Sequence, residues 1–167
     1  MLISFLTKGR GKNMAIERTF IAVKPDGVKR GLIGEVLKRF EMRGYKIIGL
    51  KMLQVTPEQA AAHYAEHVGK PFYDGLVKFI TAAPVVAIAL EGEDVVAQAR
   101  RIMGATDPNK AEIGTIRADF GQAMNRNIVH GSDSVESANR ELAIYFKSEE
   151  LMSGAKNSFD YVIESLL

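Results

Sequence analysis

Cysteine is absent from the 167-residue chain, and this absence removes several kinds of chemistry at once. The protein can form no disulfide, present no thiolate nucleophile and hold no metal through cysteine. Such a composition suits a reducing compartment, so we expect a cytoplasmic protein.

Long apolar runs are also missing. No stretch reaches the roughly 18 apolar residues that a membrane-spanning helix needs. Residues 1–13 begin apolar and then turn basic, which is the reverse of the order in a secretory signal peptide. We therefore expect no membrane association. We interpret residues 1–13 as a disordered or non-native extension, with Met14 as an alternative start, and residues 14–167 as a single domain.

The chain has no large excess of either charge. It carries 22 lysines and arginines against 20 aspartates and glutamates, for a net charge of +2. A net charge this small does not indicate nucleic acid or a membrane surface as a partner. Hydrophobic residues make up 47% and charged residues 25%, as in an ordinary globular domain with one core.

Several nucleotide and hydrolase motifs can be excluded by inspection. The chain has no GxxxxGK[ST] loop and no GxSxG, and Gly31 with Gly34 does not complete GxGxxG. One rival pattern matches, because His63, Glu66 and His67 fit the zinc-protease signature HxxEH. A catalytic zinc normally has three protein ligands, and no third ligand is evident here. We therefore favour a solvated helix face, with a metalloprotease as the minor alternative.

Hydrophobic periodicity predicts alternating strands and helices. In chain order we expect a strand over 19–23, a turn at Lys24–Gly27, a helix over 31–43, a strand over 45–55 and helices over 57–67 and 72–80. A strand over 84–90, a helix over 93–103, a loop over about 104–118, a strand ending at 128–129 and a final helix after 133 should follow. Reduced to its core, this order is βαββαβ, a ferredoxin-like α/β (α+β) sandwich with a four-stranded antiparallel sheet. A loop as long as the one over 104–118 is usually functional.

The stretch around His130 combines three local signals. Ile128–Val129 is typical of a buried strand end, Gly131 permits a bend, and Asp133 with Glu136 resembles a helix cap. His130 would then lie at a strand-to-helix junction, where unpaired N–H groups favour an anion. The alternative is that His130 only packs against its strand and that the polar residues only cap the helix.

Three separated segments carry a family resemblance, namely Ala22–Val28 (AVKPDGV), Gly114–Phe120 (GTIRADF) and Asn127–Ser134 (NIVHGSDS). The last segment contains the complete pattern N-x-x-H-G-S-D. Together they resemble the nucleoside diphosphate kinases, and the similarity extends from about Ala15 to about Glu150. The resemblance implies a kinase that transfers the γ-phosphate of ATP, GTP and other ribo- or deoxyribonucleoside triphosphates to a nucleoside diphosphate. It also implies a ping-pong mechanism through a phosphohistidine, Mg²⁺ on the nucleotide, and a homo-oligomer of four or six subunits.

The resemblance also assigns roles to residues by their place in the motifs. His130 would be the nucleophile and Glu141 would orient its imidazole, while Tyr64 would lie near the transferred group. The residues implied to bind the nucleotide are Lys24, which would also assist transfer, Phe72, Arg100, Thr106, Arg117 and Asn127. Three further residues, Gly131, Ser132 and Asp133, would support the site without acting as nucleophiles. No protein ligand to a metal is implied, because the phosphates would carry Mg²⁺. Arg101 beside Arg100 leaves a shift by one residue open.

A function from another class also remains open. Ferredoxin-like sheets serve in RNA recognition, and the chain is slightly basic. No paired aromatic motif of the required form is visible, and fold analogy alone is weak support for a function. Nucleic acid is therefore not expected as the main partner.

Overall fold

A computed structural model describes residues 16–152, so the interpretation of residues 1–13 as an extension lies outside the described residues. The strands are β1 (Ile16–Val23), β2 (Lys46–Leu53), β3 (Val85–Glu93) and β4 (Val129–Gly131). The α-helices are α1 (Pro25–Lys29), α2 (Ile33–Met42), α3 (Pro57–His63), α4 (Tyr73–Ile80), α5 (Val95–Met103), α6 (Ile116–Phe120) and α7 (Val135–Tyr145). Three short 3₁₀ helices complete the described chain, η1 (Ala65–His67), η2 (Pro108–Lys110) and η3 (Ser148–Glu150).

The four strands form one antiparallel sheet in the order β2-β3-β1-β4. β1 lies in the middle, with Ile21 opposite Ile88 of β3 on one side and Ala22 opposite His130 of β4 on the other. The short strand β4 is therefore an edge strand that brings His130 beside the end of β1. This topology confirms the predicted ferredoxin-like sandwich.

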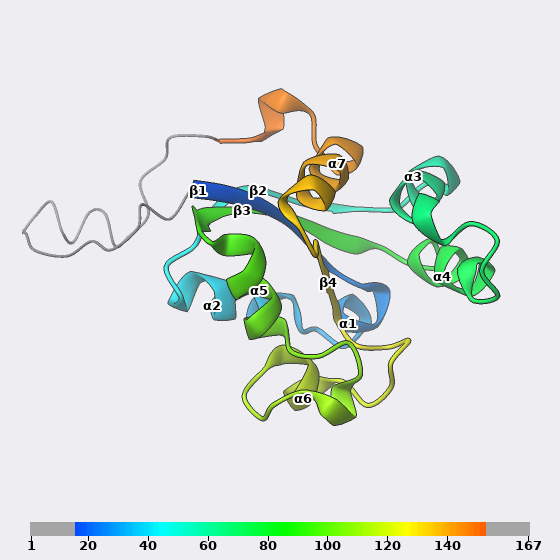
Figure 1. The fold of residues 1–167 in the computed structure, drawn as a ribbon, viewed down its shortest axis with the longest axis horizontal. Helices are drawn as coiled ribbons and strands as arrows, with labels where there is room; N and C mark the ends of the chain where they lie inside the picture. Colours follow the sequence, from blue (N-terminus) through cyan, green and yellow to red (C-terminus); the bar gives the residue numbers. More distant parts are fainter. Residues whose placement is uncertain (1–15, 153–167) are drawn as a thin grey trace, which may run out of the picture.

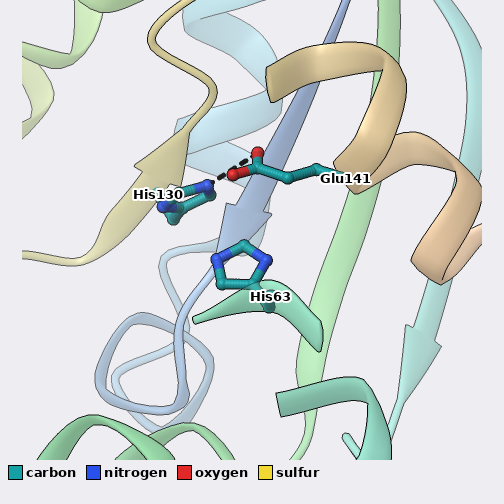
Figure 2. Close-up of side chains that lie close together, drawn as sticks. All are labelled: His63, His130 and Glu141. Atoms are coloured by element: carbon teal, nitrogen blue, oxygen red, sulfur yellow. Dashed lines mark hydrogen bonds and ion pairs between the residues drawn. The ribbon is translucent and has the colours of Figure 1, made fainter. Parts of the chain in front are cut away.

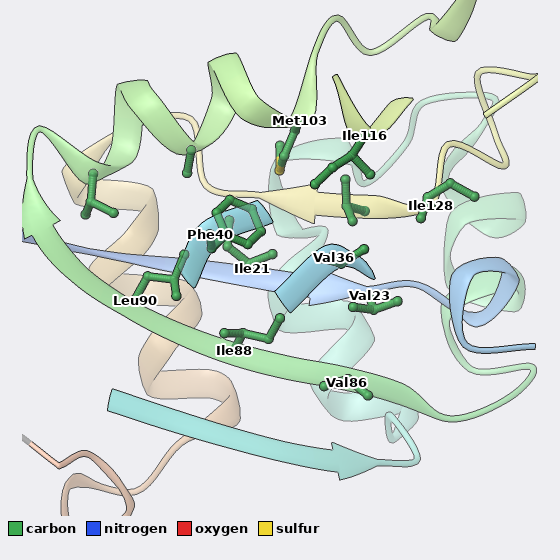
Figure 3. Close-up of a cluster of buried hydrophobic side chains, with 13 residues drawn as sticks. Ile21, Val23, Val36, Phe40, Val86, Ile88, Leu90, Met103, Ile116 and Ile128 are labelled. Carbon is green, nitrogen blue, oxygen red and sulfur yellow. The ribbon is translucent and has the colours of Figure 1, made fainter. Parts of the chain in front are cut away.

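Helices cover both faces of the sheet, with α2 and α5 on one side and α7 on the other (Figure 1). Side chains alternate along β1, so Ile21 and Val23 enter one core while Phe20 and Ala22 enter the other. The first core, shown in Figure 3, combines Ile21, Val23, Val36, Phe40, Val86, Ile88, Leu90, Met103, Ile116 and Ile128, among others. The second core packs α3, α4 and α7 against the opposite face.

Local sequence signals explain where α3 begins and where α2 ends. Thr56 caps α3 through a capping box with Gln59, and Pro57 occupies the first turn, as the sequence indicates. In α2 the residues Val36 and Phe40, one turn apart, are both fully buried. Gly44 follows α2 with a φ of +88°, a conformation in which glycine is at no disadvantage.

Three predicted element assignments are wrong. The tetrapeptide Lys24–Gly27, expected as a turn, opens helix α1, and the helix expected over 57–67 ends at His63 and continues as η1. The segment 104–118, expected to be a loop, contains η2 and the start of α6. These helices are only 3 to 5 residues long, too short for an apolar repeat to reveal them.

The stretch before α7 also differs from the prediction. Ile128 is not part of a strand, because its φ is +72°, and β4 begins one residue later and includes His130. The cap of α7 is Ser134, whose hydroxyl accepts from the Ser137 N–H, and not Asp133. Adjacent serine and aspartate residues are all good caps, so the sequence alone could not choose among them.

Candidate active site

A cleft of about 280 Å³ opens where β1 ends and β4 begins. Most of the residues implicated by the motifs line it, namely Lys24, Tyr64, Arg100, Thr106, Arg117, Asn127, His130, Gly131, Asp133 and Glu141. Ser132 lies behind the cleft against Glu141, and Phe72 is not among the lining residues. A larger, more open hollow of about 750 Å³ shares Arg100 with the cleft but does not contain His130. We therefore take the smaller cleft as the candidate site.

His130 is held by a buried carboxylate. Its Nε2 lies 2.9 Å from Oε2 of Glu141, and the Ser132 hydroxyl donates to the same oxygen at 2.6 Å. Burial by itself would raise the pKa of Glu141, but the hydrogen bond and charge of His130 and the bond from Ser132 outweigh it, so the pKa is lowered. An ionised Glu141 accepts the Nε2–H of His130, and Nδ1 then keeps its lone pair.

Lys24 stands at the exit of β1, at the N-cap of α1. Its Nζ donates to Oδ1 of Asn127 at 2.5 Å and lies 5.3 Å from the centre of the Phe79 ring. Burial lowers the pKa of Lys24 to about 8, while Asp26 raises it and Arg117 lowers it further. The ammonium group is thus poorly hydrated. An anion that binds beside it would stabilise its positive charge.

Arg117, from α6, binds two segments of backbone at the rim of the cleft. Its Nη1 donates to the Gly104 carbonyl and its Nη2 to the Val129 carbonyl, both at 2.9 Å. Burial, and then the charge of Arg100, lower the pKa of Arg117 to about 10. Arg100 in turn donates to the Gly131 carbonyl at 3.2 Å. Two guanidinium groups that repel each other beside the same cleft are stabilised by a bound anion.

The backbone before His130 is strained and held from both sides. Ile128, a β-branched residue, has a φ of +72°. Its N–H donates to Oδ2 of Asp26 at 3.0 Å, and its carbonyl accepts from the Lys24 N–H at 2.8 Å. Asn127, next to it, donates to the Thr106 carbonyl at 2.7 Å. Such strain persists only where surrounding contacts enforce it, and it is frequent at functional sites.

The HxxEH pattern does not assemble a site. α3 ends at His63, so His67 lies in η1 and not on the same helix face. Glu66 instead forms an ion pair with Arg140 at 2.6 Å, and both side chains are largely exposed. The predicted solvated face is wrong for His63, which is only 7% exposed and has its ring centre 4.5 Å from that of His130. Burial and the neighbouring His130 lower the pKa of His63 to about 3.

Comparison with known proteins identifies this arrangement. The family model for nucleoside diphosphate kinase matches residues 17–151. The chain belongs to the nucleoside diphosphate kinase family. As a member of this family it is a phosphotransferase that acts on nucleotides.

Relatives of nearly the same length support the assignment. A nucleoside diphosphate kinase of Desulforamulus reducens is 63% identical over 137 residues, which cover 82% of this chain and 92% of the relative. The cytosolic nucleoside diphosphate kinase of Dictyostelium discoideum is 57% identical over 84% of this chain and 90% of the relative. The solved nucleoside diphosphate kinase of Halobacterium salinarum, a complex with CDP, superposes with a TM-score of 0.84 at 47% identity, covering 89% of this chain and 99% of that one.

Sequence reasoning missed several contributors to this nucleoside diphosphate kinase site. Phe79 underlies Lys24, and Asp26 holds the strained peptide before His130. Asp26 belongs to a recognised motif segment, so its position beside Lys24 was an available signal. His63 was singled out only as part of the HxxEH pattern, and Phe79 carried no signal. The packing of α3 and α4 brings both side chains to the cleft.

Proposed function

We propose that the protein transfers the γ-phosphoryl group of a nucleoside triphosphate to a nucleoside diphosphate through a phosphohistidine at His130. The observation that supports this role is the hydrogen bond of 2.9 Å between His130 Nε2 and the buried Glu141, at the edge of a cleft rich in cations. A ping-pong scheme lets one pocket serve donor and acceptor in turn.

In the first half-reaction, Nδ1 of His130 attacks the γ-phosphorus. The N–P bond forms as the bond from phosphorus to the bridging oxygen breaks, and the nucleoside diphosphate leaves with that electron pair. Glu141 accepts the Nε2–H bond and stabilises the positive charge that develops on the ring. The second half-reaction is the reverse, with a different nucleoside diphosphate as acceptor.

Phosphoryl transfer depends mainly on positioning and charge neutralisation. Lys24, Arg100 and Arg117 supply three cations around the cleft, and Tyr64 adds a hydroxyl near the transferred group. We propose that Mg²⁺ arrives on the nucleotide phosphates. Glu66 is ion-paired with Arg140, which fits Mg²⁺ held by phosphate and not by this carboxylate. When bound, Mg²⁺ neutralises phosphate charge.

The outer part of the cleft would receive the nucleoside. Asn127 is proposed to bind the ribose, while Thr106 helps to hold the phosphates. Phe72 is 53% exposed at the N-terminus of α4, and we propose that a base stacks on the exposed part of its ring. Stacking tolerates every base, which is consistent with broad use of ribo- and deoxyribonucleotides. The CDP in the Halobacterium salinarum relative supports nucleotide binding in this fold.

A labelling experiment tests the proposal. The protein is incubated with γ-labelled ATP and Mg²⁺ in the absence of an acceptor. We expect acid-labile, alkali-stable label on the chain, which is released as labelled triphosphate when GDP is added. If the protein transferred phosphate in the steady state but carried no label that GDP can release, the two-step scheme would be contradicted.

Glu141 can be tested as a positioning residue. Glutamine at this position keeps an oxygen that accepts the His130 bond but lacks the negative charge, so Glu141→Gln should lower kcat about tenfold. The KM for the nucleotide should change little, because the proposed phosphate contacts remain. Steady-state kinetics with Glu136→Gln, an exposed glutamate in the first turn of the same helix, provide the control. An unchanged kcat in Glu141→Gln would exclude the orienting role.

The lowered pKa of Lys24 predicts a pH dependence. Lys24 is charged below its pKa of about 8 and neutral above it, so kcat/KM should fall as pH rises through about 8. A Lys24→Arg variant should lack this fall because its guanidinium keeps its charge, even if its absolute rate is lower. Initial rates at several pH values and low nucleotide concentration measure the effect. If kcat/KM of Lys24→Arg fell with rising pH in the same way, the fall would be due to another titrating group.

Assembly and location complete the proposal. Leu50 and Met52 on the edge strand β2, and Met42 at the end of α2, are 51%, 58% and 76% exposed. We propose that this apolar surface lies in the interface of a homo-oligomer, a tetramer or hexamer, which sedimentation would measure.

Within residues 16–152 no helix is long and apolar enough to span a membrane. The cytosolic relative supports our proposal of a cytoplasmic enzyme. We also propose that residues 14–167 belong to a single domain.

A further inference from the structure

Three side chains with metal-binding atoms meet beside the cleft. His63 comes from the end of α3, His130 from β4 and Glu141 from α7, and Figure 2 shows them directed toward one another. One ligand atom from each residue lies within 4.8 Å of the other two. Among residues 16–152 this is the one such group of histidine, cysteine and acidic side chains.

His63 has no part in the proposed phosphoryl transfer, although it is 93% buried. Its Nδ1 has no hydrogen-bond partner, which is rare for a buried polar atom. Its ring is held between Tyr64, with ring centres 4.6 Å apart, and Tyr145, at 5.6 Å. The centre of its ring also lies 4.5 Å from that of His130. A metal ion bound to His130 could therefore contact His63 as well.

The donor set matches one class of metal ion. Two imidazoles and one carboxylate, with a fourth position open to water, form a typical zinc site, whereas Mg²⁺ prefers oxygen ligands alone. In a tetrahedral zinc site the ligand atoms are about 3.4 Å apart, as follows from bonds of about 2.1 Å. The observed span, from 2.9 Å between His130 and Glu141 to at most 4.8 Å, brackets that spacing. Ser132 already orients the carboxylate through its 2.6 Å bond.

We infer that His63, His130 and Glu141 bind one Zn²⁺ ion, which replaces the hydrogen bond between His130 and Glu141 and blocks phosphorylation of His130. The block rests on the proposed function, but the binding does not. Zn²⁺ takes the lone pair of Nε2, so the single proton of the neutral ring moves from Nε2 to Nδ1. The nitrogen that would attack phosphorus then has no free lone pair.

Calorimetry on the full chain without nucleotide tests the binding. Titration with ZnCl₂ in excess Mg²⁺ should show one zinc ion per chain, and this binding should disappear in His63→Gln. The matched control is His67→Gln, the same change at the half-buried histidine four residues away, whose Nδ1 already pairs with Lys70 Nζ at 3.1 Å, and it should bind zinc like the parent protein. Binding that survives in His63→Gln, or no binding in the parent protein, would overturn the site.

Two further measurements separate the possible failures. Co²⁺ added to the unmodified chain should give the strong visible absorption of a four-coordinate site, which does not depend on the folding of any variant. Zinc added before γ-labelled ATP should prevent labelling of the parent protein and of His67→Gln, but not of His63→Gln. Zinc binding with unchanged labelling would overturn the block. A parent protein that is unlabelled even without zinc would refute the proposed function, while calorimetry would still decide the site.

Discussion

Replacing His130 by alanine is expected to lower nucleotide phosphotransfer by at least about 10⁴-fold, because removal of a covalent nucleophile abolishes the reaction path itself. The acid-labile label from γ-labelled ATP should disappear as well. Nucleotide binding should survive, since Lys24, Arg117 and Asn127 reach the cleft from other elements. Single-turnover labelling and steady-state assays measure the loss, and equilibrium binding of a nucleoside diphosphate measures what remains.

The controls for this prediction come from the other histidines and from stability. His67→Ala should still be labelled, because this half-buried residue lines the cleft but is not the nucleophile of the proposed transfer. The His130 side chain is 26% exposed, so its truncation should cost little stability, and thermal unfolding checks this. Persistent label in His130→Ala would locate the nucleophile elsewhere.

The fold was largely predictable because its long elements carry clear periodic signals. The alternation of Phe20 and Ala22 with Ile21 and Val23 divides β1 between two cores, and the helical spacing of Val36 and Phe40 defines the buried face of α2. Periodicity could not reveal α1 or α6, which have 5 residues each. Their caps and the strained Ile128 depend on contacts between segments distant in the sequence.

The candidate site was predictable only where motifs mark it. The three motif segments indicated Lys24, Arg117 and His130, and the structure brings them to one cleft. The environment of His63 could not be predicted. The sequence placed it on a solvated helix face beside Glu66 and His67, but α3 ends at His63 and turns its ring toward His130. A site assembled from α3, β4 and α7 has no linear signature, because its spacing is set by packing and not by a helical repeat.

Arg117→Ala is expected to slow phosphotransfer by about 10²-fold or more, the scale seen when one preorganised charge-stabilising donor is lost. Lys24→Ala should cause a loss of the same order. Part of the effect of Arg117→Ala could come from structure, because Arg117 also donates to the Gly104 and Val129 carbonyls. Thermal unfolding therefore has to accompany the kinetics.

The rate of Arg117→Lys distinguishes a loss of charge from a loss of structure as the cause of the defect in Arg117→Ala. Lysine keeps the charge but loses the planar fork that spans the Gly104 and Val129 carbonyls, so a purely structural role predicts a loss as large as in Arg117→Ala. A role in neutralising phosphate predicts substantial recovery of kcat. Arg101→Ala is the matched control, since Arg101 lies on exposed α5 surface outside the cleft and should leave the rate unchanged. If Arg101→Ala instead matched the defect of Arg117→Ala, the cation beside the phosphates would be Arg101 and the proposed role of Arg100 would be wrong.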